Sequence, residues 1–324
     1  MATYLVTGVA GFIASQVTQR LLAAGHTVVG LDNLNDAYDV RLKQWRLRQL
    51  EGRSGFTFRG LDITDRAALA PLFAATAFDG VVNLAARAGV QPSVEMPEVY
   101  YATNLTGTLY LLELCRAHGV PRFVLASTSS LYGKHNPMPF QEDADTSRPL
   151  SPYAASKKAA ETLCFTYHHL HGLNATVLRY FTVYGPAGRP DMSLFRFTQW
   201  ISEERPVIVY GDGRQSRDFT YVDDIAAGTV AALGLTGYNV INLGSDHPVV
   251  LLDAVHLIEE LVGHPARLEF RPMPAADLPA SWADITRARR LLDWQPQMPF
   301  ADGVQRLVAW YQANRAWASE IITA

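Results

Sequence analysis

Short apolar runs alternate with helical repeats through the first half of the chain. The pattern predicts strands at residues 4–6, 28–31, 81–84, 123–125 and 175–178, and helices at 13–24, 67–74, 98–118 and 153–171. The apolar runs do not alternate with polar residues, so both faces of the predicted sheet are buried, as in parallel sheets covered by helices. We therefore expect an α/β fold with a doubly wound parallel sheet.

The pattern changes after residue 185, where segments become shorter and are interrupted by proline and glycine. We expect one domain over residues 1–185 and a smaller C-terminal α/β domain over 186–324 that binds the substrate. A helix at 223–233 and a strand at 240–243 are expected to return to the main sheet, which assigns 221–244 to the first domain.

Composition excludes several classes of protein. The 324 residues are 48% hydrophobic and 18% charged, as in ordinary globular proteins, and a net charge of −3 gives no general attraction for nucleic acid or anionic membrane. Cys115 and Cys164 lie in helical patterns and form no metal-ligand cluster, which favours buried, reduced thiols. No secretion signal or membrane-spanning run is recognisable, so we expect a cytoplasmic protein.

A glycine-rich turn at residues 7–14 follows the first predicted strand and opens the first helix. Gly8 permits a tight turn, and Gly11 lets a pyrophosphate approach the helix N-terminus, where free N–H groups favour an anion. Asp32 ends the second strand, where it would bind the adenosine ribose hydroxyls and repel a 2′-phosphate. A Rossmann-like domain that binds NAD rather than NADP is therefore predicted. A glycine-rich turn without a ligand is the alternative interpretation.

A phenol, an ammonium group and a hydroxyl group suggest a proton-transfer unit. Tyr153 and Lys157 lie four residues apart on one face of a predicted helix, and the strand at 123–125 runs into the hydroxyl-rich stretch 127–130. Lowering the pKa of a tyrosine from about 10 to near 7 needs about 4 kcal/mol, which Lys157 and a positively charged nicotinamide could supply. Each motif arises often by chance, but their order after the glycine-rich turn argues against coincidence.

These motifs resemble those of the extended short-chain dehydrogenase/reductase family over nearly the whole chain. The matching stretches are residues 7–13, 62–63, 83–86, 104–108, 131–133, 151–157, 217–224 and 242–244. Residues 31–39, 88–90 and above all 179–192 resemble the UDP-glucuronate 4-epimerase branch. Three departures are Ala14 for the usual third glycine, Gln91 where the branch often has arginine, and 275–276, two alanines where proline and glycine are common.

The resemblance assigns roles to individual residues. Thr128, Tyr153 and Lys157 would be catalytic. Residues expected to bind NAD are Gly8, Gly11, Phe12, Ile13, Asp32, Asn33, Asp62, Ile63, Leu84, Ala85, Ala86, Arg87, Tyr153, Lys157, Tyr180 and Val183. Residues expected to bind the UDP-sugar are Ser127, Thr128, Ser129, Thr182, Arg189, Arg217 and Asp277.

The implied reaction is NAD-dependent 4-epimerisation of UDP-glucuronic acid to UDP-galacturonic acid through a 4-keto intermediate. Ser129 and Ser130 stand where decarboxylating or dehydrating relatives carry acidic residues, which favours retention of the carboxylate. Epimerisation of a neutral UDP-hexose, net oxidation or reduction with NAD released each turnover, and a non-catalytic dinucleotide sensor remain as alternatives. The helices at 98–118 and 153–171 resemble those of a four-helix dimer interface in relatives, so a homodimer is expected.

Overall fold

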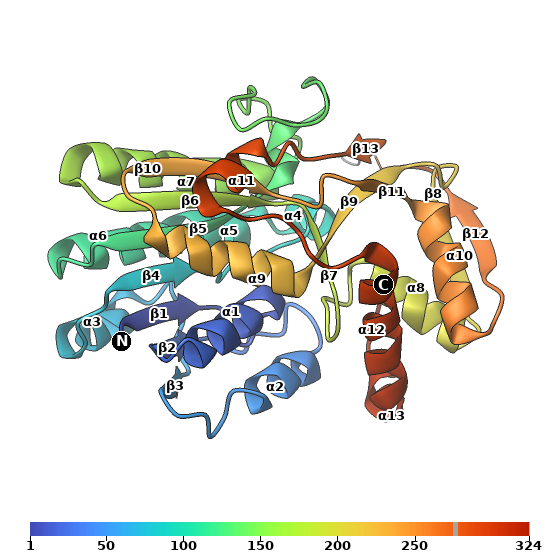
Figure 1. Cartoon of the computed structure of the whole chain (residues 1–324), viewed down its shortest axis with the longest axis horizontal. Helices are drawn as coiled ribbons and strands as arrows, with labels where there is room; N and C mark the ends of the chain where they lie inside the picture. Colours follow the sequence, from blue (N-terminus) through green and yellow to red (C-terminus); the bar gives the residue numbers. More distant parts are fainter. Residues whose placement is uncertain (275–277, 324) are drawn as a thin grey trace.

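Seven parallel strands form the central sheet of the computed structural model, which describes residues 1–274 and 278–323 (Figure 1). Their order across the sheet is β10-β6-β5-β4-β1-β2-β3. The strands are β1 (Thr3–Thr7), β2 (Thr27–Leu31), β3 (Phe56–Arg59), β4 (Gly80–Asn83), β5 (Arg122–Thr128), β6 (Asn174–Tyr180) and β10 (Tyr238–Leu243). This arrangement confirms the predicted doubly wound α/β fold.

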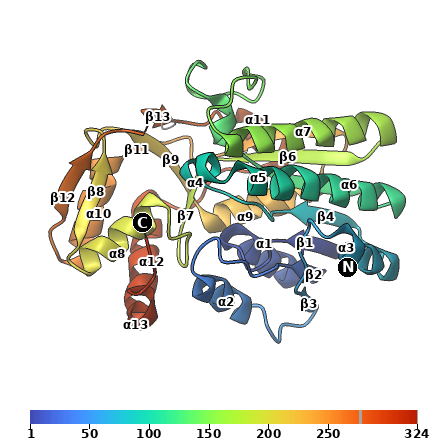
Figure 2. The same cartoon turned by 180° about the vertical axis from the view of Figure 1, so that it is seen from behind.

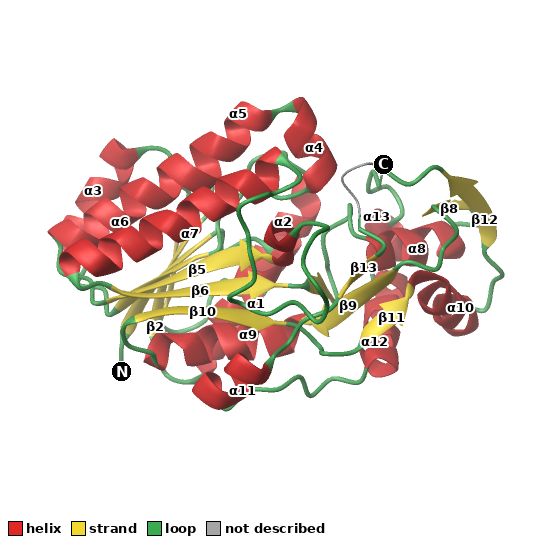
Figure 3. Ribbon diagram, turned by 90° about the horizontal axis from the view of Figure 1, so that it is seen from above, coloured by secondary structure: helices red, strands yellow, loops and turns green. Residues whose placement is uncertain are grey.

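Helices cover both faces of this sheet (Figure 3). On one face lie α1 (Phe12–Ala23), α9 (Val222–Ala231) and α11 (Thr286–Leu292), with α2 (Val40–Arg48) packed beside α1. On the other face lie α3 (Arg66–Ala75), α4 (Val90–Glu95), α5 (Pro97–Tyr100), α6 (Thr108–Ala117) and α7 (Pro152–His171), which Figure 2 shows from behind. The apolar strand residues are buried between the two layers; Leu5, Val81 and Leu125 are fully inaccessible.

The strand order reverses between β1 and β4, and the crevice beyond this point is where doubly wound sheets bind ligands. Thr7, the last residue of β1, connects the two strands that flank this crevice. Its hydroxyl donates to Asn83 Oδ1 at 2.7 Å and accepts hydrogen bonds from the backbone N–H groups of Leu84 at 3.2 Å and Ala85 at 3.1 Å. The loop after β4 is thereby tied to the turn after β1.

The second half of the chain builds a smaller lobe but also completes the main sheet. Strand β10 pairs in parallel with β6, and α9 packs on α1. In the smaller lobe β9 pairs with β7, β11 and β13, while β8 pairs with β12. Its elements are β7 (Thr182–Tyr184), α8 (Ser193–Ser202), β8 (Pro206–Tyr210), β9 (Ser216–Tyr221), β11 (Pro248–Val250), α10 (Leu251–Val262), β12 (Arg267–Arg271), β13 (Ala280–Ser281), α12 (Phe300–Ala313) and α13 (Arg315–Ala318).

The single helix predicted at 98–118 is interrupted. A π-helical turn, Tyr101–Gly107, separates α5 from α6. Within it, Asn104 faces inward, donates to Arg87 O and Ser156 Oγ at 3.0 Å each, and accepts from Arg87 N at 2.9 Å. The wider turn lets a helix residue reach the loop after β4, which explains a break that apolar periodicity does not reveal.

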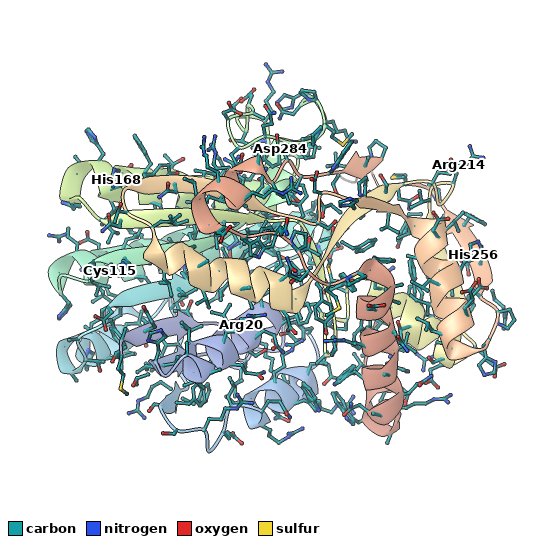
Figure 4. All side chains as sticks on the ribbon, in the orientation of Figure 1. Arg20, Cys115, His168, Arg214, His256 and Asp284 are labelled. Atoms are coloured by element: carbon teal, nitrogen blue, oxygen red, sulfur yellow. The ribbon has the colours of Figure 1, made fainter. Side chains whose placement is uncertain are left out.

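Two further expectations concern membrane-spanning segments and the state of the two cysteines. Of the helices in the described ranges, none combines the length and the apolar character needed to span a bilayer. Cys115 and Cys164 are both free and buried, as predicted. Figure 4 shows Cys115 within the main lobe, far from the smaller lobe that carries Arg214 and His256.

Candidate active site

The turn between β1 and α1 leaves no room for a side chain at either of its two glycines. Gly8 has φ +69°, and a Cβ there would lie 2.8 Å from the Ala85 backbone; one on Gly11 would lie 2.7 Å from the Gly8 carbonyl oxygen. Gly11 also forms the N-cap of α1 without a side-chain partner. The helix N-terminus is therefore open to a phosphate at close range, and the turn fits the diphosphate of a dinucleotide.

Asp32 lies directly after β2 and is buried against this turn. Its carboxylate accepts from the backbone N–H groups of Ala10 at 3.2 Å and Leu34 at 2.8 Å. Asn33 reaches across to Asp62, donating to its carboxylate at 2.6 Å. Two acidic residues thus stand side by side at the end of the crevice where the adenosine of a dinucleotide would lie.

A cleft runs from the glycine turn past these acids. Most of the residues predicted to hold the cofactor line it: Gly8, Gly11, Asp32, Asn33, Asp62, Ile63, Leu84, Ala85 and Ala86. Lys43 of α2 also lines it, 3.7 Å from Asp32, and burial lowers the pKa of this lysine although Asp32 opposes the shift. Lys43 was missed because α2 follows a polar stretch and its sequence gives no chemical motif.

Tyr153 and Lys157 project from the first turns of α7 toward the end of β5. Ser151 caps this helix by accepting from Ala154 N, and Pro152 occupies its first position. The Thr128 side chain lies close enough to the Tyr153 phenol to act on its pKa, and its own hydroxyl donates to Ser130 Oγ at 3.1 Å. Lys157 Nζ donates to Ala126 O at 2.9 Å. Two successive turns of one helix therefore contact the last residues of one strand, which brings the three predicted catalytic side chains together.

Burial raises the pKa of Tyr153, while the Thr128 side chain and the positive charge of Arg189 oppose the shift. Burial lowers the pKa of Lys157 to about 8, against the influence of Glu161. The lysine is committed to a backbone carbonyl rather than to the phenol. The chain alone therefore keeps Tyr153 protonated, and ionisation of the phenol needs a further positive charge close to it.

The side chains of Ser127 and Tyr180, both predicted to bind ligands, are bonded to other side chains within the main lobe. The Ser127 hydroxyl, expected at the substrate, donates to buried Glu161 at 2.6 Å. The Tyr180 hydroxyl, expected at the cofactor, lies 2.8 Å from Thr229 Oγ1 in the core. Adjacent strand residues face opposite sides of a sheet, so Thr128 and Ser127 cannot both point at the same ligand. Ser127 and Tyr180 can reach a ligand only through their backbone.

A second pocket opens beside β7. Thr182, Val183 and Arg189, all predicted to bind ligands, line it. Other lining residues that we did not predict include Met192, Phe195, Phe219 and Leu307. They come from α8 and the residue before it, from β9 and from α12, which meet at this place only in the folded chain. Because the Arg189 charge lowers the pKa of Tyr153, the arginine lies within electrostatic reach of the phenol.

The buried guanidinium of Arg46 holds the loop before Arg189 in place through hydrogen bonds. Arg46 of α2 is only 2% exposed, and it donates to Ala187 O at 2.7 and 2.9 Å and to Gly188 O at 3.1 Å. The same guanidinium donates to Ala10 O at 3.2 Å in the glycine-rich turn. Arg46 therefore joins the turn that fits a diphosphate to the loop that carries Arg189.

The remaining predicted residues lie around these pockets. Phe12 and Ile13 open α1, Arg87 is held by Asn104, and Ser129 begins the short 3-10 turn after β5. Arg217 lies on β9, two residues before the pocket residue Phe219, and donates to Ser216 O at 2.8 Å. Asp277 lies outside the described residues.

Comparison with protein families agrees with this arrangement. Residues 4–244 match the NAD dependent epimerase/dehydratase family. A UDP-glucuronate 4-epimerase of Thermodesulfobacterium geofontis is 52% identical over 315 residues, which cover 97% of each chain.

Two solved structures are also similar. The crystal structure of UDP-glucuronic acid 4-epimerase from Bacillus cereus, in complex with UDP-glucuronic acid and NAD, superimposes with a TM-score of 0.91 at 36% identity, covering 96% of this chain and 99% of that one. The UDP-glucose 4-epimerase of Thermotoga maritima with UDP-glucose gives a TM-score of 0.88 at 29% identity, covering 97% and 99% of the two chains. The likeness therefore includes epimerases named for an acidic and for a neutral sugar.

Proposed function

The chain belongs to the NAD-dependent epimerase/dehydratase family, and from this premise we propose that it interconverts UDP-glucuronic acid and UDP-galacturonic acid through a 4-keto intermediate. The observation that carries the proposal is the position of Tyr153, which lies on the first turn of α7 one turn before Lys157, at the end of β5, where the charge of Arg189 acts on its phenol. A proton acceptor and a cation that could bind a carboxylate within one site support this reaction. A dinucleotide-sensing module would need neither.

The chain supplies the proton chemistry. Tyr153 takes the proton from the C4 hydroxyl of the sugar, and Thr128, whose side chain lies beside the phenol, keeps it in position. Bound NAD in its oxidised form supplies the hydride acceptor and the positive charge that the phenolate needs. Lys157, bonded to the backbone of β5, keeps a second cation nearby at neutral pH, because its pKa is about 8.

The acidic sugar requires protection from decarboxylation, because its 4-keto form is a β-keto acid. We propose that Thr182 and Arg189 hold the carboxylate in an orientation that disfavours loss of CO₂. Ser129 and Ser130 add hydroxyl groups in the turn after Thr128, and no acidic side chain stands in that turn to repel the carboxylate.

A neutral UDP-hexose is the second candidate substrate, since a similar structure is that of a UDP-glucose 4-epimerase. Arg189 favours the acid, because a guanidinium in the pocket wall would gain more from a carboxylate than from a neutral C6 hydroxyl. We also propose a homodimer, which two large apolar side chains of α7 support: Phe165 and Leu170 leave 51% and 64% of their surfaces exposed.

Proton NMR of the reaction mixture tests the substrate assignment. UDP-glucuronate should be converted to UDP-galacturonate without appreciable UDP-pentose, and faster than UDP-glucose is converted to UDP-galactose. Arg189→Ala should reduce use of the acid by about 10- to 100-fold, since a charge-assisted contact contributes about 1.5–3 kcal/mol. Accumulation of a UDP-pentose, or faster turnover of the neutral hexose, would contradict the assignment.

The cofactor preference gives a separate prediction. Replacing Asp32 by alanine should weaken NAD binding and reduce its advantage over NADP, because a carboxylate that binds ribose hydroxyls and repels a 2′-phosphate is lost. Calorimetric titration of both cofactors measures this, with Asp36→Asn as a control for the loss of one negative charge nearby. Equal affinity of the wild-type protein for NAD and NADP would refute the role given to Asp32.

A further inference from the structure

Arg189 already holds a carboxylate of its own chain. Its Nε donates to Asp191 Oδ1 at 3.1 Å, and its Nη2 donates to Asp191 Oδ2. Both oxygens are therefore bound by one edge of the guanidinium, in the two-bond geometry by which arginine binds free carboxylates. A sugar carboxylate approaching this pocket meets a cation that is already partly neutralised.

The surroundings allow this pair to open at little cost. Arg189 and Asp191 leave 25% and 42% of their side-chain surfaces exposed, so Asp191 can turn into water when it is released. An exposed pair of this kind contributes little to stability. The backbone behind Arg189 is fixed, because Arg46 binds Ala187 O and Gly188 O from the buried side. Arg189 can therefore change partners by side-chain movement alone.

We propose that Asp191 is a specificity-determining residue that competes with the sugar carboxylate for Arg189. The inference rests on the proposed use of UDP-glucuronate. Asp191 weakens the binding of acidic sugars and leaves neutral sugars unaffected. Epimerisation also requires the sugar to turn about its diphosphate, so that its carboxylate leaves Arg189 in at least one pose. Asp191 then takes its place, and the guanidinium is not left without a partner.

The electrostatics of the phenol agree with such a pair. Burial raises the pKa of Tyr153 and of Tyr100; the charge of Arg189 opposes this rise in both, whereas the charge of Asp191 adds to it. The two charges therefore offset each other at the reacting groups while they are paired. Exchange of Asp191 for a substrate carboxylate keeps this balance, since one negative charge replaces another.

Binding in an inactive background tests the proposal without turnover. Tyr153→Phe and Tyr153→Phe/Asp191→Asn, both loaded with NAD, are titrated with UDP-glucuronate, UDP-glucose and UDP in a calorimeter. Asp191→Asn should tighten UDP-glucuronate by about two- to fivefold, the range expected from an exposed ion pair of about 0.4–1 kcal/mol. Affinities for UDP-glucose and UDP should stay the same within error.

The matched control is Asp36→Asn in the same background, which removes one negative charge from the segment that borders the cofactor cleft. It should not change the preference for UDP-glucuronate over UDP-glucose. An equal gain in this control, an unchanged preference in Asp191→Asn, or weaker binding of the acid, as an orienting role predicts, would each overturn the proposal. If wild type fails to epimerise UDP-glucuronate, the proposed function fails first and this inference with it.

Discussion

Turnover should fall by about 10³-fold or more when Tyr153 is replaced by phenylalanine, with the fold and most NAD binding retained. The substitution removes one oxygen, on whose pKa the Thr128 side chain and the Arg189 charge act, and keeps the ring that packs in the site. General acid–base catalysis contributes about 10²–10⁴-fold. Initial rates of epimerisation at neutral pH, with circular dichroism for the fold, measure the effect.

Tyr100→Phe is the matched control. Its ring lies edge-on to Tyr153, with centroids 6.2 Å apart, and its hydroxyl donates to Ala88 O at 3.1 Å. Loss of this neutral hydrogen bond should cost less than about tenfold in rate, since such a bond contributes about 0.5–1.5 kcal/mol. Retention of more than a tenth of wild-type turnover by Tyr153→Phe, or an equal loss in both variants, would remove Tyr153 as the base.

The second large effect concerns stability. Glu161→Gln should reduce the free energy of unfolding by about 3–5 kcal/mol, because it leaves a buried guanidinium without its counter-charge. Glu161 binds Arg179 through contacts of 3.0 and 2.8 Å, and both side chains are only 3% exposed. Ser127 donates to the same carboxylate, so the substitution also weakens a charge-assisted hydrogen bond at the end of the catalytic strand. Urea denaturation with and without the substitution measures the difference.

Glu269→Gln provides the comparison for that experiment. Glu269 and Arg271 form an ion pair on β12 in which both side chains are 47% exposed. Its loss should cost less than about 1 kcal/mol. If Glu161→Gln costs no more than this exposed control, the buried pair does not support the strand.

Local pattern was sufficient for the parts of the site that lie within one element. The spacing of Tyr153 and Lys157 follows from helical geometry, and the position of Asp32 follows from the end of a strand. The glycine turn was likewise predictable, because its two glycines stand where the chain must turn and a helix begins. These features depend on residues only a few positions apart.

Other features depend on contacts between distant residues, which periodicity does not contain. Arg46 meets a loop 141 residues further along the chain, and Ser127 meets a carboxylate 34 residues away. A buried arginine in a polar helix and a serine in a hydroxyl-rich stretch look like surface residues in the sequence. The alternation of side chains along a strand predicts that Ser127 and Thr128 face opposite sides of the sheet, but it does not identify the partner of either residue.

Arg46 has a thermodynamic consequence for the two ligands. Arg46 joins the glycine-rich turn to the loop before Arg189, so a ligand that orders one of these segments also orders the other. By linkage, any factor by which NAD improves the affinity for the UDP-sugar is also the factor by which the sugar improves the affinity for NAD. An isomerase must return the hydride that it removed, so a dinucleotide held more firmly while the sugar is bound would stay in place until the hydride has been returned.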